Sequence, residues 1–191
     1  MKNLSSFTAI HGPWSGCLAA IVFAFPFAAI SQGATVVWNG APIVFSKSAF
    51  ADFTQATQQD RITANVWLTR GGTQGLFNFF AEPGFTHFQS PTGTEWAFGT
   101  TANFGALTYT DWETWTDGVI GGPPGTVGRD AVVRLHSGAD TIYLDLKFTS
   151  WGSSGSGGAF SYIRSTAPVP EPGSIALLGL GAILLSSRRR R

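Results

Sequence analysis

Cysteine, histidine and charged residues are all scarce in this chain, and each shortage excludes a class of site. The 191 residues include one cysteine, Cys17, so no disulfide can form within the chain. Neither a Cys-x-x-Cys nor a His-x-x-His pair occurs, so the ordinary ligand spacing of a zinc site is absent. Charged residues make up 12% of the chain, whereas a soluble domain usually has about 25%. We therefore expect apolar packing to hold the fold.

The short motifs of common enzymes are missing as well. The chain has no Gly-x-Ser-x-Gly nucleophile elbow and no phosphate-binding loop. Gly155-Ser156-Gly157 begins like a dinucleotide fingerprint, but Phe160 stands where the third glycine is required. His87 and His136 are interpreted as packed or surface side chains. The sequence therefore predicts no catalytic residue, no cofactor and no metal ligand.

The formal net charge of +1 hides an acidic body between two basic ends. Lys2 and Arg188–Arg191 account for five of the 12 basic residues, while Glu171 is the one acidic residue near an end. The remainder carries seven basic and ten acidic residues, a net charge of −3. A nucleic-acid-binding surface needs a basic stripe, so no nucleic-acid partner is expected.

Residues 1–34 have the pattern of a secretory signal peptide. Lys2 gives a weakly positive start, and residues 17–30 form an apolar run of 14 residues that is short for a membrane span. Small residues follow at Ser31, Gly33 and Ala34, as a cleavage site requires. We expect export through the Sec translocon; a retained membrane anchor is the alternative.

The C-terminal segment, residues 168–191, has three parts in a fixed order. The first is the Pro-rich run Val169-Pro170-Glu171-Pro172-Gly173, and the second is the apolar stretch 174–187. The third consists of Arg188, Arg189, Arg190 and Arg191. Fourteen residues span about 21 Å as a helix, and terminal arginines keep their end of such a helix on the cytoplasmic side.

This three-part segment resembles the PEP-CTERM sorting signal of Gram-negative bacteria. The resemblance implies a transient stay in the inner membrane, recognition by an exosortase and cleavage near Pro170-Glu171-Pro172. It also implies release or transfer to the cell surface, commonly in bacteria that produce exopolysaccharide. A generic tail anchor is the alternative. Because unrelated domains carry such signals, the resemblance predicts location and not activity.

The body, residues 35–167, has the two-residue periodicity of β-strands. In the segment 141–148 the apolar residues Ile142, Leu144, Leu146 and Phe148 alternate with polar ones. Ser137-Gly138-Ala139-Asp140 fits a hairpin connection between this strand and residues 131–136. The other expected strands are 35–38, 42–46, 61–69, 75–80, 94–98, 105–110 and 159–164. Many short strands and no long amphipathic helix predict an all-β fold, a single antiparallel β-sandwich or jelly roll.

A second resemblance covers the end of the body. The strand 143–151, a Gly/Ser loop and the strand 158–166 are similar to a block found in uncharacterised secreted bacterial proteins. This resemblance implies export and a β-rich fold, and it implies no chemistry.

Three candidate sites involve the aromatic and acidic residues of the body. Acids and threonines surround Trp112 and Trp115, so we expect both to be exposed and able to stack on sugar rings. Glu95 and Glu113 each lie beside a tryptophan and are the candidate carboxylate pair of a glycan-active enzyme. The acidic stretch 111–117 has three carboxylates, the kind of oxygen ligand that Ca²⁺ binds, and is the third candidate.

Taken together, these features predict a secreted or cell-surface protein without enzymatic activity. The expected partners are the exosortase, the translocon and the inner membrane, with exopolysaccharide or biofilm matrix as a possible ligand. A carbohydrate-binding domain is the first alternative, and a secreted glycan-active enzyme using Glu95 and Glu113 is the second.

Overall fold

The computed structural model describes residues 32–153 and 155–169. Most of the expected signal peptide lies outside these residues, as do Pro170, Glu171, Pro172 and Arg188–Arg191. Within the described part, no helix is long and apolar enough to cross a membrane.

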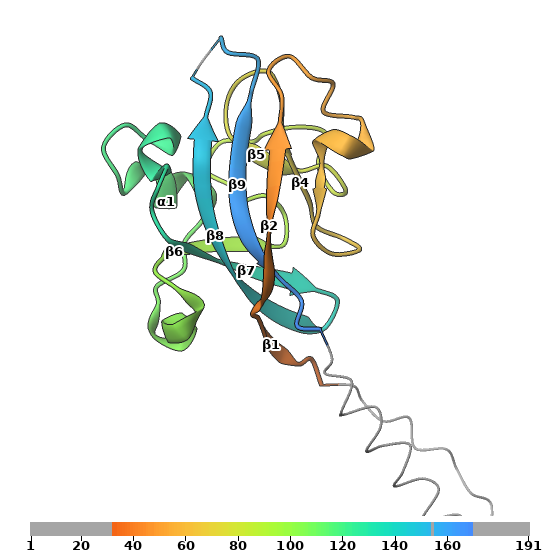
Figure 1. The fold of residues 1–191 in the computed structure, drawn as a ribbon, viewed down its shortest axis with the longest axis vertical. Coiled ribbons are helices and arrows are strands. Elements are labelled where there is room, and N and C mark those ends of the chain that lie inside the picture. Colours follow the sequence, from red (N-terminus) through yellow and green to blue (C-terminus); the bar gives the residue numbers. More distant parts are fainter. Residues whose placement is uncertain (1–31, 154, 170–191) are drawn as a thin grey trace, which may run out of the picture. The chain divides into compact units, whose positions relative to one another are not determined.

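The main sheet has six strands (Figure 1). They are β1 (Thr35–Trp38), β2 (Gly40–Lys47), β6 (Thr94–Phe98), β7 (Ala131–Ser137), β8 (Asp140–Trp151) and β9 (Phe160–Thr166). Their order is β2-β9-β8-β7-β6, all antiparallel, and β1 pairs in parallel with the first half of β8. The long strand β8 therefore supports both β1 and β9 along one edge.

A second, three-stranded sheet has the order β3-β4-β5. These strands are β3 (Asp60–Arg61), β4 (Trp67–Arg70) and β5 (Leu76–Asn78). The helical elements are short: α1 (Trp112–Asp117) and the 3₁₀ turns η1 (Ala56–Gln58), η2 (Thr101–Ala106) and η3 (Pro123–Thr126). The mostly antiparallel β architecture confirms the predicted fold class and is consistent with a β-sandwich.

The alternation read from the sequence sets which face of β8 is buried. Ile142, Leu144, Leu146 and Phe148 point to the inner face and are buried, as predicted. Ser137 pairs with Asp140, which leaves Gly138 and Ala139 as a two-residue hairpin turn. Gly138 has φ +62°, a value that glycine reaches without steric cost. The predicted hairpin is therefore confirmed.

The core lies between the inner face of the main sheet, the smaller sheet and α1. Aromatic side chains dominate it: the ring centroid of Trp96 lies 4.8 Å from that of Trp112 and 5.3 Å from that of Trp115. Apolar residues from the smaller sheet, including Leu68 and Leu76, belong to the same cluster. Burial of this apolar surface is the main term that stabilises the fold.

Two local predictions need correction, and one short helix was not predicted. Residues 105–110 do not form a strand; the segment belongs partly to η2 and makes an isolated bridge from Thr110 to Trp96. The expected strand 61–69 is split into β3 and β4 by a turn. The short helix α1 was not predicted, although Asp111 caps it by accepting hydrogen bonds from the backbone N–H groups of Glu113 and Thr114.

The two flanking segments join the domain at the same end of the main sheet. Thr166, the last residue of β9, pairs with Gly40 at the start of β2. At the other end of these strands Phe160 pairs with both Lys47 and Trp151. The residues of β9 span about 20 Å between these two ends at about 3.3 Å per residue. The end of the sheet where β8 leads into β9, at Trp151 and Phe160, is therefore opposite to Thr166, the end of the last strand before the tail.

Candidate functional site

A groove with a volume of about 290 Å³ lies at the Trp151 and Phe160 end of the main sheet. It is bounded by the end of β4, the end of β8, helix α1, the start of η3 and the loops that precede and follow β5. Its walls include Arg70, Gly75, Phe85, Trp112, Asp117 and Trp151. We call it the Arg70 groove, because Arg70 is its central polar residue.

Arg70 is a buried cation that has no carboxylate partner among the described residues. It is 2% exposed. Its Nε donates to the carbonyl oxygen of Gln74 at 2.7 Å, and its Nη1 donates to those of Gly152 and Ala159 at 2.8 and 3.2 Å. Burial lowers the pKa of Arg70 to about 10, so the group stays charged at neutral pH. Its Nη2 makes no hydrogen bond to the described residues.

A second buried cation lies near the first. Lys47 is 2% exposed, and its Nζ makes long contacts of 3.4 and 3.5 Å to the carbonyl oxygens of Ser48 and Gly157. Burial, followed by repulsion from Arg70, lowers the pKa of Lys47. This end of the domain thus holds two buried positive charges, and neither forms an ion pair within the described residues.

Aromatic rings make up the apolar walls of the groove. The Arg70 guanidinium carbon lies 4.0 Å from the centroid of the Trp151 ring, a cation–π contact that covers one face of that ring. The Phe85 ring meets the His87 ring edge-on at 4.9 Å. Trp151 and Phe85 are both half-buried. An apolar surface of this kind beside a few polar groups is typical of small-molecule sites.

Gly75 lies in close contact with two other groove residues and leaves no room for a side chain. A side-chain carbon at this position would lie 2.4 Å from the Phe85 ring and 2.7 Å from Trp112 Nε1. Any larger residue would therefore have to displace Phe85 or cover the indole N–H of Trp112.

The exposure predicted for Trp112 and Trp115 is wrong. Trp112 is 1% exposed and Trp115 is 3% exposed, because α1 turns both rings onto Trp96 and Phe148 in the core. Neither ring face can stack on a sugar. Trp112 nevertheless lines the groove, and its Nε1 lies beside Gly75 without a hydrogen bond to the described residues. Trp115 does not line the groove, and its Nε1 is buried without a partner.

The rim of the groove carries two acidic residues, Glu113 and Asp117, and Glu113 is already hydrogen-bonded to its neighbours. Glu113 accepts from His87 Nδ1 at 2.7 Å and from the backbone N–H of Phe88. Burial opposes ionisation of Glu113, but the bonds from Phe88 and His87 outweigh it and lower its pKa. Asp117 is exposed at the rim. The stretch 111–117 does not gather metal ligands: no group of three or more such side chains occurs among the described residues.

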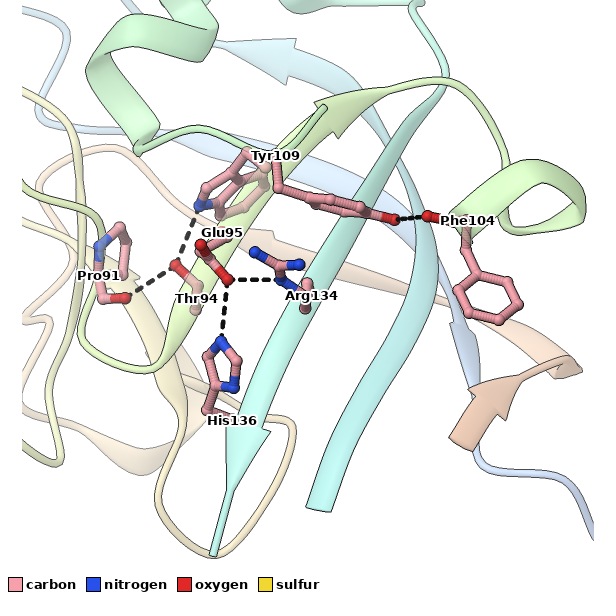
Figure 2. Close-up of polar contacts among 8 residues, drawn as sticks. Pro91, Thr94, Glu95, Phe104, Tyr109, Arg134 and His136 are labelled. Atoms are coloured by element: carbon pink, nitrogen blue, oxygen red, sulfur yellow. Dashed lines mark hydrogen bonds and ion pairs between the residues drawn. The ribbon is translucent and has the colours of Figure 1, made fainter. Parts of the chain in front are cut away.

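A separate charged cluster occupies the outer face of the main sheet (Figure 2). Glu95 on β6 lies directly opposite Arg134 on β7, and its Oε2 accepts from Arg134 Nε at 2.5 Å and from His136 Nε2 at 2.9 Å. The Tyr109 ring packs over the guanidinium, with 4.5 Å from its centroid to Cζ. His136 is half-exposed and points outward, as its place in the alternating pattern predicts.

The structure gives Glu95 and Glu113 separate partners on separate elements. Glu95 binds Arg134 and His136 on the sheet, whereas Glu113 binds His87 and Phe88 beside α1. The hydrogen bond from Arg134 is the main cause that lowers the pKa of Glu95. A general acid for glycoside hydrolysis needs a raised pKa instead. The expected carboxylate pair is therefore not assembled.

A larger groove of about 520 Å³ crosses the outer face near Asn39 and Ile163. Its charged groups are already paired, since Asp145 accepts from Thr101 and Lys147 binds Asp130 at 2.7 Å. The Arg70 groove differs because two of its donors, Arg70 Nη2 and Trp112 Nε1, have no hydrogen-bond partner among the described residues. Sequence reasoning missed Arg70 and Trp151, which lie 81 residues apart in the chain and meet only through the packing of the two sheets.

Comparison with known proteins supports the interpretation of the tail. Residues 168–191 match the family model described as the PEP-CTERM protein-sorting motif. This match confirms the resemblance seen in the sequence and is consistent with an exosortase substrate. No curated protein matches the chain, and no solved structure matches it.

Proposed function

We propose that this protein is an exported, non-enzymatic glycan-binding domain of the extracellular matrix of a Gram-negative bacterium. Its PEP-CTERM motif implies export, a membrane-anchored intermediate and processing by an exosortase. The body would then act at the cell surface or in the medium by binding exopolysaccharide.

The observation that carries this proposal is the combination of groups in the Arg70 groove. Trp151 and Phe85 supply apolar walls, and Arg70 Nη2 and Trp112 Nε1, which make no hydrogen bond to the described residues, supply donors. Sugars have this dual character, with apolar ring faces and a rim of oxygen acceptors. A volume of about 290 Å³ suits one or two sugar residues rather than a long buried chain.

The position of the groove also fits this function. The sorting tail leaves from the Thr166 end of β9, whereas the groove lies at the Phe160 end. The groove therefore lies at the end of β9 opposite to the one from which the chain continues toward the tail. It would remain accessible to matrix polymers before and after cleavage.

The pKa shifts and hydrogen bonds of the two candidate acids support the proposed lack of catalysis. Both Glu95 and Glu113 have lowered pKa values and are bound to other side chains. Neither is poised to donate a proton to a leaving group near neutral pH.

Binding is tested with the full-length protein purified in mild detergent and titrated with exopolysaccharide from the producing cells. Because Trp112 and Trp151 line the groove, we expect intrinsic tryptophan fluorescence to change and saturate on binding. Phe85→Leu should weaken binding, whereas Phe80→Leu, at an exposed ring outside the groove, should not. The absence of any fluorescence or calorimetric signal at millimolar sugar would exclude glycan binding.

A further inference from the structure

The Arg70 groove holds a positive charge that the fold leaves unbalanced. The other buried arginine, Arg164, is paired with the carboxylate of Asp60 through two hydrogen bonds of 2.6 and 2.8 Å. Arg70 is also buried, but its hydrogen bonds go only to neutral carbonyl groups, and its contact with the Trp151 ring supplies no counter-ion. A buried cation without a counter-ion is costly, so a site that keeps one is a candidate for binding an anion.

Two donors in the groove are free to meet such an anion. Nη2 of Arg70 has no hydrogen bond to the described residues, and neither has Nε1 of Trp112 beside Gly75. Both side chains are at least nine-tenths buried and line the same groove. Guanidinium and indole N–H groups only donate, so the ligand atoms that they recognise must be acceptors.

We propose that the Arg70 groove binds a carboxylate-bearing sugar, with the carboxylate at Arg70 Nη2 and Trp112 Nε1. This inference rests on the proposed glycan-binding function and adds the chemical class of the ligand. The sugar ring lies against Phe85, since Arg70 already covers a face of Trp151. A sugar hydroxyl can donate to Asp117 at the rim.

Acidic groups at the rim oppose an anionic ligand, but they are weaker than the buried charge. Asp117 is exposed, so water and salt screen its repulsion. Glu113 is half-buried and bound to His87 and Phe88. Arg70 acts from a poorly solvated position, where the effective dielectric is lower and attraction is stronger, and Lys47 adds positive charge from the same side.

The test uses the full-length protein in detergent and isothermal calorimetry with three probes of equal length. These are glucuronic-acid oligosaccharides, neutral glucose oligosaccharides and sulfated glucose oligosaccharides. We expect the wild type to bind the uronate at least about tenfold more tightly than the neutral chain, as one added charge-assisted hydrogen bond would give. Arg70→Lys keeps the charge but removes the fork of donors, and it should reduce uronate affinity about tenfold to a hundredfold.

Two pairs of variants keep the test decisive if Arg70→Lys does not fold. Trp112→Phe removes the groove indole N–H and should weaken uronate binding about threefold to tenfold, while Trp115→Phe makes the same change outside the groove and should leave it unchanged. Asp117→Asn removes an exposed repulsive charge and should tighten uronate binding up to about fivefold. Asp130→Asn removes an exposed charge that lies outside the Arg70 groove, and it should leave uronate binding unchanged.

The outcomes separate this inference from the function on which it rests. Equal binding of the neutral and uronate chains would overturn the carboxylate assignment and leave glycan binding intact. A preference for the sulfated chain alone would also overturn it. Failure to bind any of the three probes or the exopolysaccharide would overturn both proposals.

Discussion

Asp60 and Arg164 form a buried ion pair that joins the two sheets. Arg164 on β9 donates from Nε to Asp60 Oδ2 at 2.6 Å and from Nη2 to Oδ1 at 2.8 Å. The hydroxyl of Tyr162, also on β9, donates to the same carboxylate at 2.7 Å. Burial, together with the charge of Asp60, raises the pKa of Tyr162 well above its ordinary value, so the phenol stays protonated as the donor.

Removing the charge of Asp60 should destabilise the fold strongly. Asp60→Asn leaves the guanidinium of Arg164 buried without a counter-ion, and we expect a loss of about 3–5 kcal/mol in the free energy of unfolding. Chemical denaturation measures this loss. Asp130→Asn is the control, because its ion pair with Lys147 is exposed and should cost at most about 1 kcal/mol. Similar losses in the two variants would contradict the role given to the buried pair.

The two core tryptophans Trp96 and Trp115 should respond differently to the same substitution. Trp96 Nε1 donates to Thr94 Oγ1 at 3.0 Å, whereas Trp115 Nε1 is buried without a partner. Replacing Trp96 by phenylalanine removes a hydrogen bond to Thr94. Replacing Trp115 by phenylalanine removes a buried donor that has no partner among the described residues. We expect Trp115→Phe to be less destabilising than Trp96→Phe by about 1–3 kcal/mol in thermal or denaturant unfolding. Equal losses in the free energy of unfolding would show that both substitutions act through packing and not through the indole N–H.

The Glu95 cluster should make stability depend on pH at the acid end. The hydrogen bond from Arg134 is the first cause that lowers the pKa of Glu95 in the folded state below 4.5, its ordinary value. The resulting stabilisation is fully present above that value and is lost as the pH falls through the lower, folded pKa. As the pH is lowered below 4.5, the melting temperature of Glu95→Gln should therefore decrease less than that of the wild type. A parallel decline would refute this contribution.

Processing of the tail is tested by the intact mass of the protein recovered from cells and medium. We expect the mature form to end near residues 170–173, without Arg188–Arg191. Replacing Pro170-Glu171-Pro172 by alanines should leave the tail attached and hold the protein in the membrane fraction. A wild-type protein that keeps its four arginines would argue for a simple tail anchor.

The local part of the fold could be predicted because β-strands report their buried face through alternation. The pattern in β8 and the Gly138 turn both identify structure that depends on neighbouring residues alone. The segment 105–110 also has strand-forming residues, but the structure places it over the outer face of the sheet, where Tyr109 covers Arg134. Alternation cannot tell a sheet strand from a covering loop, because both have one apolar side.

The candidate site was only partly accessible to sequence reasoning. Polar neighbours suggested that Trp112 and Trp115 were exposed, but Asp111 caps a short helix that turns both rings inward. Polar residues beside a tryptophan in sequence need not surround it in space. No sequence pattern marks Arg70, because its distinguishing property is burial without a carboxylate partner among the described residues, which depends on how the chain packs.

The all-β class, the β7–β8 hairpin and the sorting motif at residues 168–191 could all be predicted from the residues in their order along the chain. These features depend on local periodicity, turn chemistry and the order of short segments. The burial of the tryptophans and the contact between Arg70 and Trp151 in a groove at the Phe160 end of β9 became apparent in the folded domain alone. Burial and the balance of charges arise from contacts between distant segments, and these contacts exist only after the two sheets pack together.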